Sequence, residues 1–85
     1  LVNNQMIPIG VTVQFDIEGE VFPKSFTLKG VQYSIDAVGR KWQDEKGNHF
    51  LVMVPSERVY ELLFVPKEMC WYQVPYGMQN RTTPA

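Results

Sequence analysis

The chain is short of the residues on which disulfide staples, metal sites and membrane spans depend. Its 85 residues include one cysteine, Cys70, and one histidine, His49. A single cysteine excludes an internal disulfide framework, and no Cys/His spacing for a structural metal site exists. No apolar run approaches the roughly 20 residues of a membrane span, and the first residues lack the basic start and long apolar core of a signal peptide. We therefore expect a reducing, cytoplasmic location, no membrane contact and no cofactor.

The net charge of the chain is small, but the charged residues are unevenly distributed along it. The formal net charge is −1, which argues against a surface dominated by nucleic-acid binding. Residues 21–42 hold four basic residues and one acidic residue, a net +3, whereas residues 1–20 hold three acidic residues and no basic one. The basic residues of the middle segment are Lys24, Lys29, Arg40 and Lys41.

Apolar and polar residues alternate along several short stretches that turn residues separate. A period of two is typical of a strand with one dry and one wet face. The pattern predicts strands over 11–17, 21–28, 31–42, 49–54, 58–65 and 69–74. A helix over 56–64, capped by Ser56, is the competing interpretation, and its Val, Tyr and Phe content favours a strand.

These strands predict an all-β fold, a small antiparallel meander of five or six strands that closes into an SH3-like barrel. Residues 11–75 form the single domain, with a flexible N-terminal arm over 1–10 and a flexible C-terminal tail over 76–85. Pro23 lacks an N–H group and should lie at an edge or a bulge. Gly39 follows two adjacent apolar residues, which indicates a bulge or bend inside the strand over 31–42.

A longer pattern of aromatic, glycine and apolar residues resembles that of a known protein family. Residues 26–38 read Phe-Thr-Leu-Lys-Gly-Val-Gln-Tyr-Ser-Ile-Asp-Ala-Val and lead to Trp42, and Tyr-Glu-Leu at 60–62 and Trp-Tyr at 71–72 follow. This resembles a bacterial family of small uncharacterised all-β domain proteins, some with a Phe-x-Trp-x-Gly-x-x-Tyr-x-Val pattern followed by a Trp. Leu28 stands where that pattern has Trp. Some members are encoded beside genes for Y-family DNA polymerases, and the family implies a fold but no established activity.

Residue types with catalytic or metal-binding chemistry are isolated in this sequence. We expect His49 to be a structural histidine at the start of a strand, beside a turn, and Cys70 to be a buried, inert thiol. Residues 44–48 read as a solvated turn, because the oxygen ligands of a calcium loop are missing. Asp36 and Glu61 read as separate, outward-facing strand carboxylates rather than a catalytic pair. An enzyme is therefore the least favoured class.

Aromatic residues near the C-terminal end are candidates for protein contact. If Tyr72 faces the core together with Cys70 and Val74, then Trp71 faces outward, where it needs a cover. Trp71, Tyr72 and Tyr76 then form a contact patch, because Trp and Tyr dominate interface hot spots. This favours a non-enzymatic module that binds another protein or a second copy of itself.

The alternative is an accessory nucleic-acid-binding domain. Cations beside an exposed aromatic side chain bind single strands through charge and base stacking. The residues that would do so are Lys24, Lys29, Arg40, Lys41 and Trp42. Anchoring of the barrel by Trp42, with the cations solvating its outside, is the simpler interpretation of the same set. No small-molecule substrate is evident.

Overall fold

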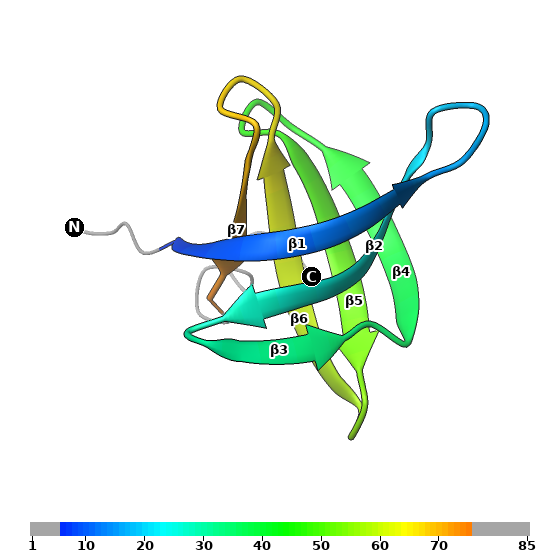
Figure 1. Ribbon diagram of the computed structural model, residues 1–85. Helices are drawn as coiled ribbons and strands as arrows, with labels where there is room; N and C mark the ends of the chain where they lie inside the picture. The colour runs from blue at the N-terminus through cyan, green and yellow to red at the C-terminus, as the bar shows by residue number, and fades with distance from the viewer. Residues whose placement is uncertain (1–5, 76–85) are drawn as a thin grey trace, which may run out of the picture.

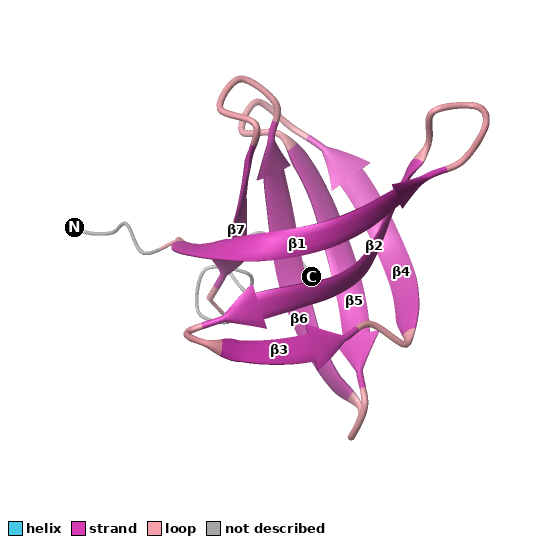
Figure 2. Cartoon of the chain, viewed as in Figure 1, coloured by secondary structure: helices cyan, strands magenta, loops and turns pink. Residues whose placement is uncertain are grey.

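The computed structural model describes residues 6–75 of the chain. Seven antiparallel strands, joined by turns, lie in this part (Figures 1 and 2). They are β1 (Ile7–Phe15), β2 (Val21–Leu28), β3 (Val31–Ser34), β4 (Ala37–Gln43), β5 (Asn48–Val54), β6 (Arg58–Val65) and β7 (Cys70–Val74). The all-β antiparallel fold is confirmed, and residues 58–65 form a strand rather than a helix. Among the described residues there is no helix long and apolar enough to cross a membrane.

The strands form one sheet in the order β3-β2-β1-β7-β6-β5-β4. β1 belongs to both halves of this sheet, because Ile7–Ile9 pair with β7 and Gly10–Phe15 pair with β2. The sheet curls at this shared strand, so that β1, β2 and β3 run across one face of β4–β7 (Figure 1). The result is a barrel-like fold with a front layer, β1–β3, and a back layer, β4–β7.

The strand expected over 31–42 is divided into β3 and β4, which is why the structure has seven strands rather than five or six. The N–H group of Ile35 donates to the carbonyl of Lys24 in the front layer, 2.9 Å away, and that of Asp36 donates to the carbonyl of Met53 in the back layer, 2.7 Å away. The chain therefore passes from one layer to the other within two residues.

Two bulges lie near the positions that the sequence indicates. The register of β4 with β5 shifts between Val38 and Lys41, a stretch that contains Gly39. The register of β1 with β2 shifts where Thr12 pairs with Ser25 and Val13 pairs with Pro23, which leaves Lys24 as the extra residue. The expectation that Pro23 lies at an edge or a bulge is confirmed.

The core lies between the two layers. It consists of Phe26, Phe50, Val52, Val54 and Leu62, each at most 7% exposed. Phe26 of β2 crosses to the back layer, and its ring lies 5.1 Å from that of Tyr33 in β3 and 5.3 Å from that of Tyr60 in β6. These three aromatic rings join the layers.

The first strand begins earlier than the sequence predicts. β1 starts at Ile7, and Ile7, Pro8 and Ile9 pair with Gln73, Tyr72 and Trp71 of β7. The boundary between arm and domain at residue 11 is therefore too late, because residues 7–10 are part of the sheet. The tail expected over 76–85 lies outside the described residues.

Substitution of Gly47 tests the tight turn between β4 and β5. Gly47 has a φ of 151°, and a Cβ atom added there would fall on the carbonyl oxygen of Phe64. We expect Gly47→Ala to lower the free energy of unfolding by about 2–4 kcal/mol, because the clash is with backbone. Gly10→Ala is the matched control, since nothing lies within 4 Å of its Cβ position. Urea unfolding followed by tryptophan fluorescence measures both; equal stability of the two variants would contradict this account of the turn.

Candidate functional site

His49 lies between two carboxylates on the outer face of the back layer, the face turned away from β1–β3. Its Nδ1 is 2.7 Å from Oε2 of Glu61, and its Nε2 is 2.9 Å from Oδ1 of Asp44. His49 and Glu61 are 6% and 5% exposed. Each ring nitrogen of His49 therefore has a carboxylate oxygen as its hydrogen-bond partner. The cluster is a hydrogen-bonded network, buried at His49 and Glu61, that links the β4–β5 turn to β6.

The turn before β5 is built around the Asp44 side chain. Oδ1 of Asp44 accepts hydrogen bonds from the backbone N–H groups of Lys46 at 2.9 Å and Gly47 at 3.3 Å, in addition to its contact with His49. An aspartate that bonds to the backbone two or three residues ahead closes a turn on itself. The side chain that shapes the turn is thus the one that holds His49.

Trp42 covers the histidine from the neighbouring strand. Trp42 and His49 are register partners on β4 and β5. Their rings are stacked, with centroids 4.9 Å apart and planes 4° apart. The guanidinium carbon of Arg40 lies 4.8 Å from the centre of the Trp42 ring. The tryptophan therefore contacts both a cation and the imidazole, which is favourable for a ring with a negative face.

Hydrogen bonding changes the acidity of the turn aspartate. Burial pushes the pKa of Asp44 up, but three effects outweigh it: the hydrogen bond from His49, the positive charge of its ring, and the amides of Lys46 and Gly47. The pKa of Asp44 therefore lies below its ordinary value of 3.8. The carboxylate is ionised at neutral pH, which suits its role as an acceptor.

The arrangement offers little for catalysis or metal binding. The His49 side chain is 7% exposed and both of its nitrogens are hydrogen-bonded, so neither nitrogen is free to exchange a proton with a bound molecule. Within residues 6–75, no three His, Cys, Asp or Glu side chains are placed to hold a metal ion. The geometry is that of a structural clamp between the β4–β5 turn and β6.

The sequence interpretation missed this cluster. His49 does start a strand beside a turn, but Glu61 is buried and bonded rather than outward in solvent, and Asp44 is engaged rather than merely solvated. The signal lay in the hairpin register: with the turn at 55–57, His49 is opposite Leu63, and Glu61 is its diagonal neighbour. Asp36, considered as a partner of Glu61, lies at the crossing between β3 and β4 instead.

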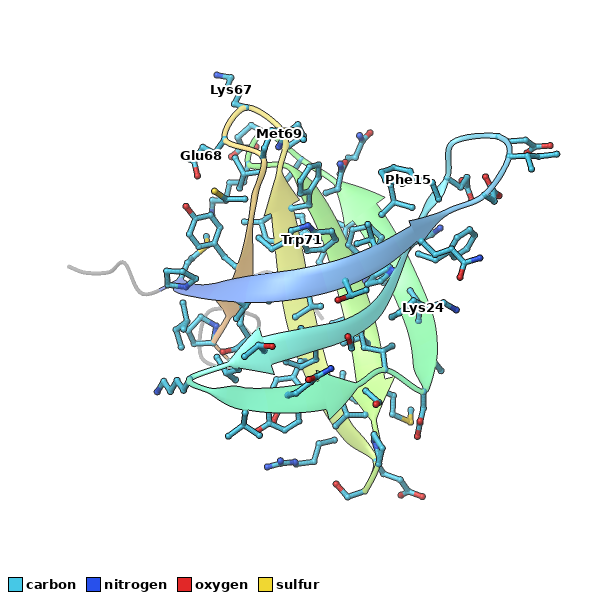
Figure 3. All side chains as sticks on the ribbon, in the orientation of Figure 1. Phe15, Lys24, Lys67, Glu68, Met69 and Trp71 are labelled. Atoms are coloured by element: carbon cyan, nitrogen blue, oxygen red, sulfur yellow. The ribbon has the colours of Figure 1, made fainter. Side chains whose placement is uncertain are left out.

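The basic residues do not gather on one face. Arg40 lies over Trp42, but Lys41 turns toward β2, with its Nζ 5.6 Å from the centre of the Phe22 ring and 4.0 Å from Oε1 of Glu20. Lys24 occupies the β2 bulge (Figure 3). Lys29 follows the far end of β2, so roughly the length of that strand, about 23 Å, separates it from Lys41. The structure joins only Arg40 and Trp42 of the predicted nucleic-acid set.

The contact patch predicted around Trp71 is wrong in its orientation. Trp71 faces the interior, because it pairs with Phe64 of β6, and its ring packs 5.0 Å from Phe64 and 5.4 Å from Phe50 (Figure 3). Cys70, expected to be buried, is exposed, and its Sγ contacts the carbonyl of Glu68 at 3.3 Å.

The other two members of that patch are Tyr72 and Tyr76. Tyr72 lies on the outer face, and its hydroxyl donates to Glu68 over 2.6 Å. That hydrogen bond raises the pKa of Tyr72 above its ordinary value, helped by burial and by the negative charge of the same carboxylate. Tyr76 lies outside the described residues.

Large apolar side chains are also exposed elsewhere, among them two groups of neighbours and the single residues Val31 and Met69. Phe15 at the end of β1 is 64% exposed, and Ile17 in the following turn is 100% exposed. On the outer face, Met53 and Val59 are register partners and are 39% and 53% exposed. The sequence indicates the second group, because the strand over 49–54 is apolar on both faces and Met53 lies on one of them. It does not indicate the first, because strand alternation alone assigns Phe15 and Ile17 to the core.

No family model matches the chain, and neither a curated protein nor a solved structure matches it significantly. The resemblance to the bacterial family with the Phe-x-Trp-x-Gly pattern stays a prediction.

Removing His49 should expose the cost of an unpaired buried charge. We expect His49→Leu to lower the free energy of unfolding by about 3 kcal/mol, because the Glu61 carboxylate loses the partner that its burial requires. The double variant His49→Leu/Glu61→Leu should regain at least half of that loss, since no charge is then left unpaired. Chemical denaturation of the wild type, both single variants and the double variant measures the coupling. Purely additive losses would show that the two side chains do not act together.

The acid sensitivity of the fold should depend on Asp44. Its pKa is lower in the folded state than in the unfolded chain, so ionised Asp44 stabilises the fold above about pH 4, and this contribution is lost as the pH falls through the folded-state value. The difference in unfolding free energy between the wild type and Asp44→Asn should therefore shrink from about pH 5 to about pH 2. Glu45→Gln removes one charge from the same turn and serves as the control. A difference that is constant over this range would refute the assignment.

Proposed function

We propose that this chain is a non-enzymatic, SH3-like interaction module of the cytoplasm that binds another protein. The observation that carries the proposal is the pair Phe15 and Ile17, which the β1–β2 hairpin holds out in solvent. An exposed hairpin with two large apolar side chains is typical of a contact surface, since soluble proteins seldom expose such groups together without a use. Figure 1 shows this hairpin projecting beyond the two layers.

The hairpin is an ordered structure rather than a loose loop. Oδ1 of Asp16 accepts from the N–H groups of Glu18 and Glu20, each at 2.9 Å. The N–H group of Asp16 donates to the carbonyl of Glu20 at 3.1 Å, and Gly19 takes the positive φ of 86° that the turn requires. The tip is thereby fixed with Ile17 outward. A preorganised anchor of this kind loses little conformational entropy when it binds.

Nucleic-acid binding has less support than protein binding. Lys41 is turned toward Glu20 and Phe22, and Lys29 lies at the other end of β2. Acidic side chains at 16, 18 and 20 add negative charge beside the one basic stretch of β4. Only the Arg40–Trp42 pair remains as a stacking platform, and a single platform gives weak binding without a charged groove to track the backbone.

A paired set of surface variants tests the proposal. We expect the wild type to form a complex, either with itself in sedimentation velocity at high concentration or with a protein captured from a lysate of its source cells. Phe15→Ser/Ile17→Ser should weaken this complex by about 2 kcal/mol or more, because both anchors are lost. Val31→Ser is the matched control, since Val31 is 51% exposed on β3, at another part of the surface. A strictly monomeric wild type with an empty capture experiment would overturn the proposal.

A further inference from the structure

Several stretches of strand have no partner on one side, and an unpaired edge is a template for another chain. Within the described residues, three such stretches are at least four residues long, and the start of β2 over 21–23 is a shorter fourth one. The three are the outer edges of β3 and β4 and Gly10–Phe15 of β1. Because every second residue of an edge directs its N–H and C=O groups outward, each stretch offers hydrogen bonds to an added strand.

Three of these four edges carry features that prevent pairing. β4 has a bulge between Val38 and Lys41, together with the charges of Arg40 and Lys41. The start of β2 contains Pro23, which has no N–H group to donate. β3 is only four residues long. Bulges, charges, proline and short length are the usual means by which proteins blunt an edge.

The edge of β1 carries none of these protections. Residues 10–15 read Gly-Val-Thr-Val-Gln-Phe, with no charge and no proline. They pair with β2 on one side, but β7 pairs only as far as Ile9 on the other. Figure 1 shows β2 along the lower border of β1, whereas β4, β5 and β6, which extend above β1 in this view, cross behind it and are not its hydrogen-bonded neighbours. This is the one long edge whose sequence favours pairing.

Apolar side chains lie where an added strand would place its own. The point at which β1 leaves β7 forms a depression of about 330 Å³, lined by residues 8–11 and 69–72. Trp71, whose ring packs at a tilt against those of Phe50 and Phe64, is the register partner of Ile9 at this point. Figure 3 shows Trp71 and Phe15 on the same side of β1 as the unpaired border. Alternate side chains of a bound strand would meet these rings.

The charge at the far end of this edge indicates the character of the occupant. Asp16, Glu18 and Glu20 follow directly after β1, and Lys41, 4.0 Å from Glu20, is the one basic side chain with a contact to them among the described residues. The end of the edge is therefore acidic. A bound strand that carries a basic residue here would be complementary in charge.

We propose that Gly10–Phe15 of β1 binds an extended segment of a partner protein by strand addition. The segment carries apolar side chains at alternate positions and a basic residue beside the 16–20 turn. Main-chain hydrogen bonds supply affinity, and the aromatic rings and the acidic turn supply selectivity. This inference rests on the proposed function and names where and how the partner binds.

Synthetic peptides test the main-chain part of the proposal. The probe is a fluorescent peptide of alternating valine and threonine with lysines at both ends, N-methylated on every second amide so that one edge stays open. Its control is the same peptide with all amides methylated. In anisotropy titrations we expect the control to bind at least about tenfold more weakly, because it cannot donate to the edge. Equal binding of the two peptides would overturn strand addition.

Variants of the protein locate the site. Thr12→Lys places a charge on the unpaired edge, and Thr27→Lys is its control, because Thr27 pairs with both Gly10 of β1 and Gln32 of β3. We expect Thr12→Lys to weaken the open-edge peptide about tenfold and Thr27→Lys to leave it unchanged. Glu18→Gln/Glu20→Gln should weaken binding severalfold and reduce its salt dependence. Equal effects of the two lysine variants would place the peptide elsewhere.

Three further outcomes distinguish strand addition to a partner segment from the alternatives. If the wild type is a dimer that Thr12→Lys dissociates, the edge is occupied by a second copy of the chain, and the proposed partner segment is wrong. If neither peptide binds while Phe15→Ser/Ile17→Ser still abolishes complex formation, strand addition is wrong and the interaction module stands. If the hairpin variants also have no effect, the proposed function fails with it.

Discussion

The burial of Phe26 between the two layers is the contact on which the curled sheet depends. Strand pairing alone joins all seven strands into one continuous sheet, and it does not require that sheet to fold back on itself. Phe26 is 1% exposed and contacts the rings of Tyr33 and Tyr60, one from each layer. Apolar burial is the dominant favourable contribution to folding, and here it is concentrated where the layers cross. The bulge at Lys24 brings β2 into that position, and the crossing at Ile35 and Asp36 completes the curl.

The strands could be predicted from the sequence, but their division between layers could not. A period of two and the turn residues locate six segments, and Pro23 and Gly39 mark irregularities that the structure confirms as bulges. The break between β3 and β4 depends on hydrogen bonds from Ile35 and Asp36 to two strands far away in sequence. No local pattern records such bonds. The same limit hides the start of β1 at Ile7, because pairing with β7, rather than alternation, makes those residues a strand.

The candidate site shows the limit of predicting side-chain orientation from strand alternation alone. Residues 69–74 are apolar on both faces, so alternation could not decide which of Trp71 and Tyr72 faces inward; pairing with Phe64 decides it. To predict the Asp44–His49–Glu61 cluster, one must know both the register of the β5–β6 hairpin and the shape of the β4–β5 turn. The register followed from the strands already assigned, whereas the reach of Asp44 depends on the backbone of Lys46 and Gly47. Buried polar groups of this kind are satisfied in the folded structure and leave no trace in hydropathy.

The clamp formed by His49 has a consequence for motion in the β4–β5 turn. A surface turn ordinarily opens by itself, and its amides exchange with solvent far faster than those of core strands. Here the amides of Lys46 and Gly47 bond to Asp44, which bonds to His49, which bonds to the buried Glu61 of β6. Opening of the turn must therefore break a hydrogen-bonded network that reaches into the sheet. We therefore expect these two peripheral amides to exchange together with those of β5 and β6, although they lie in an exposed turn.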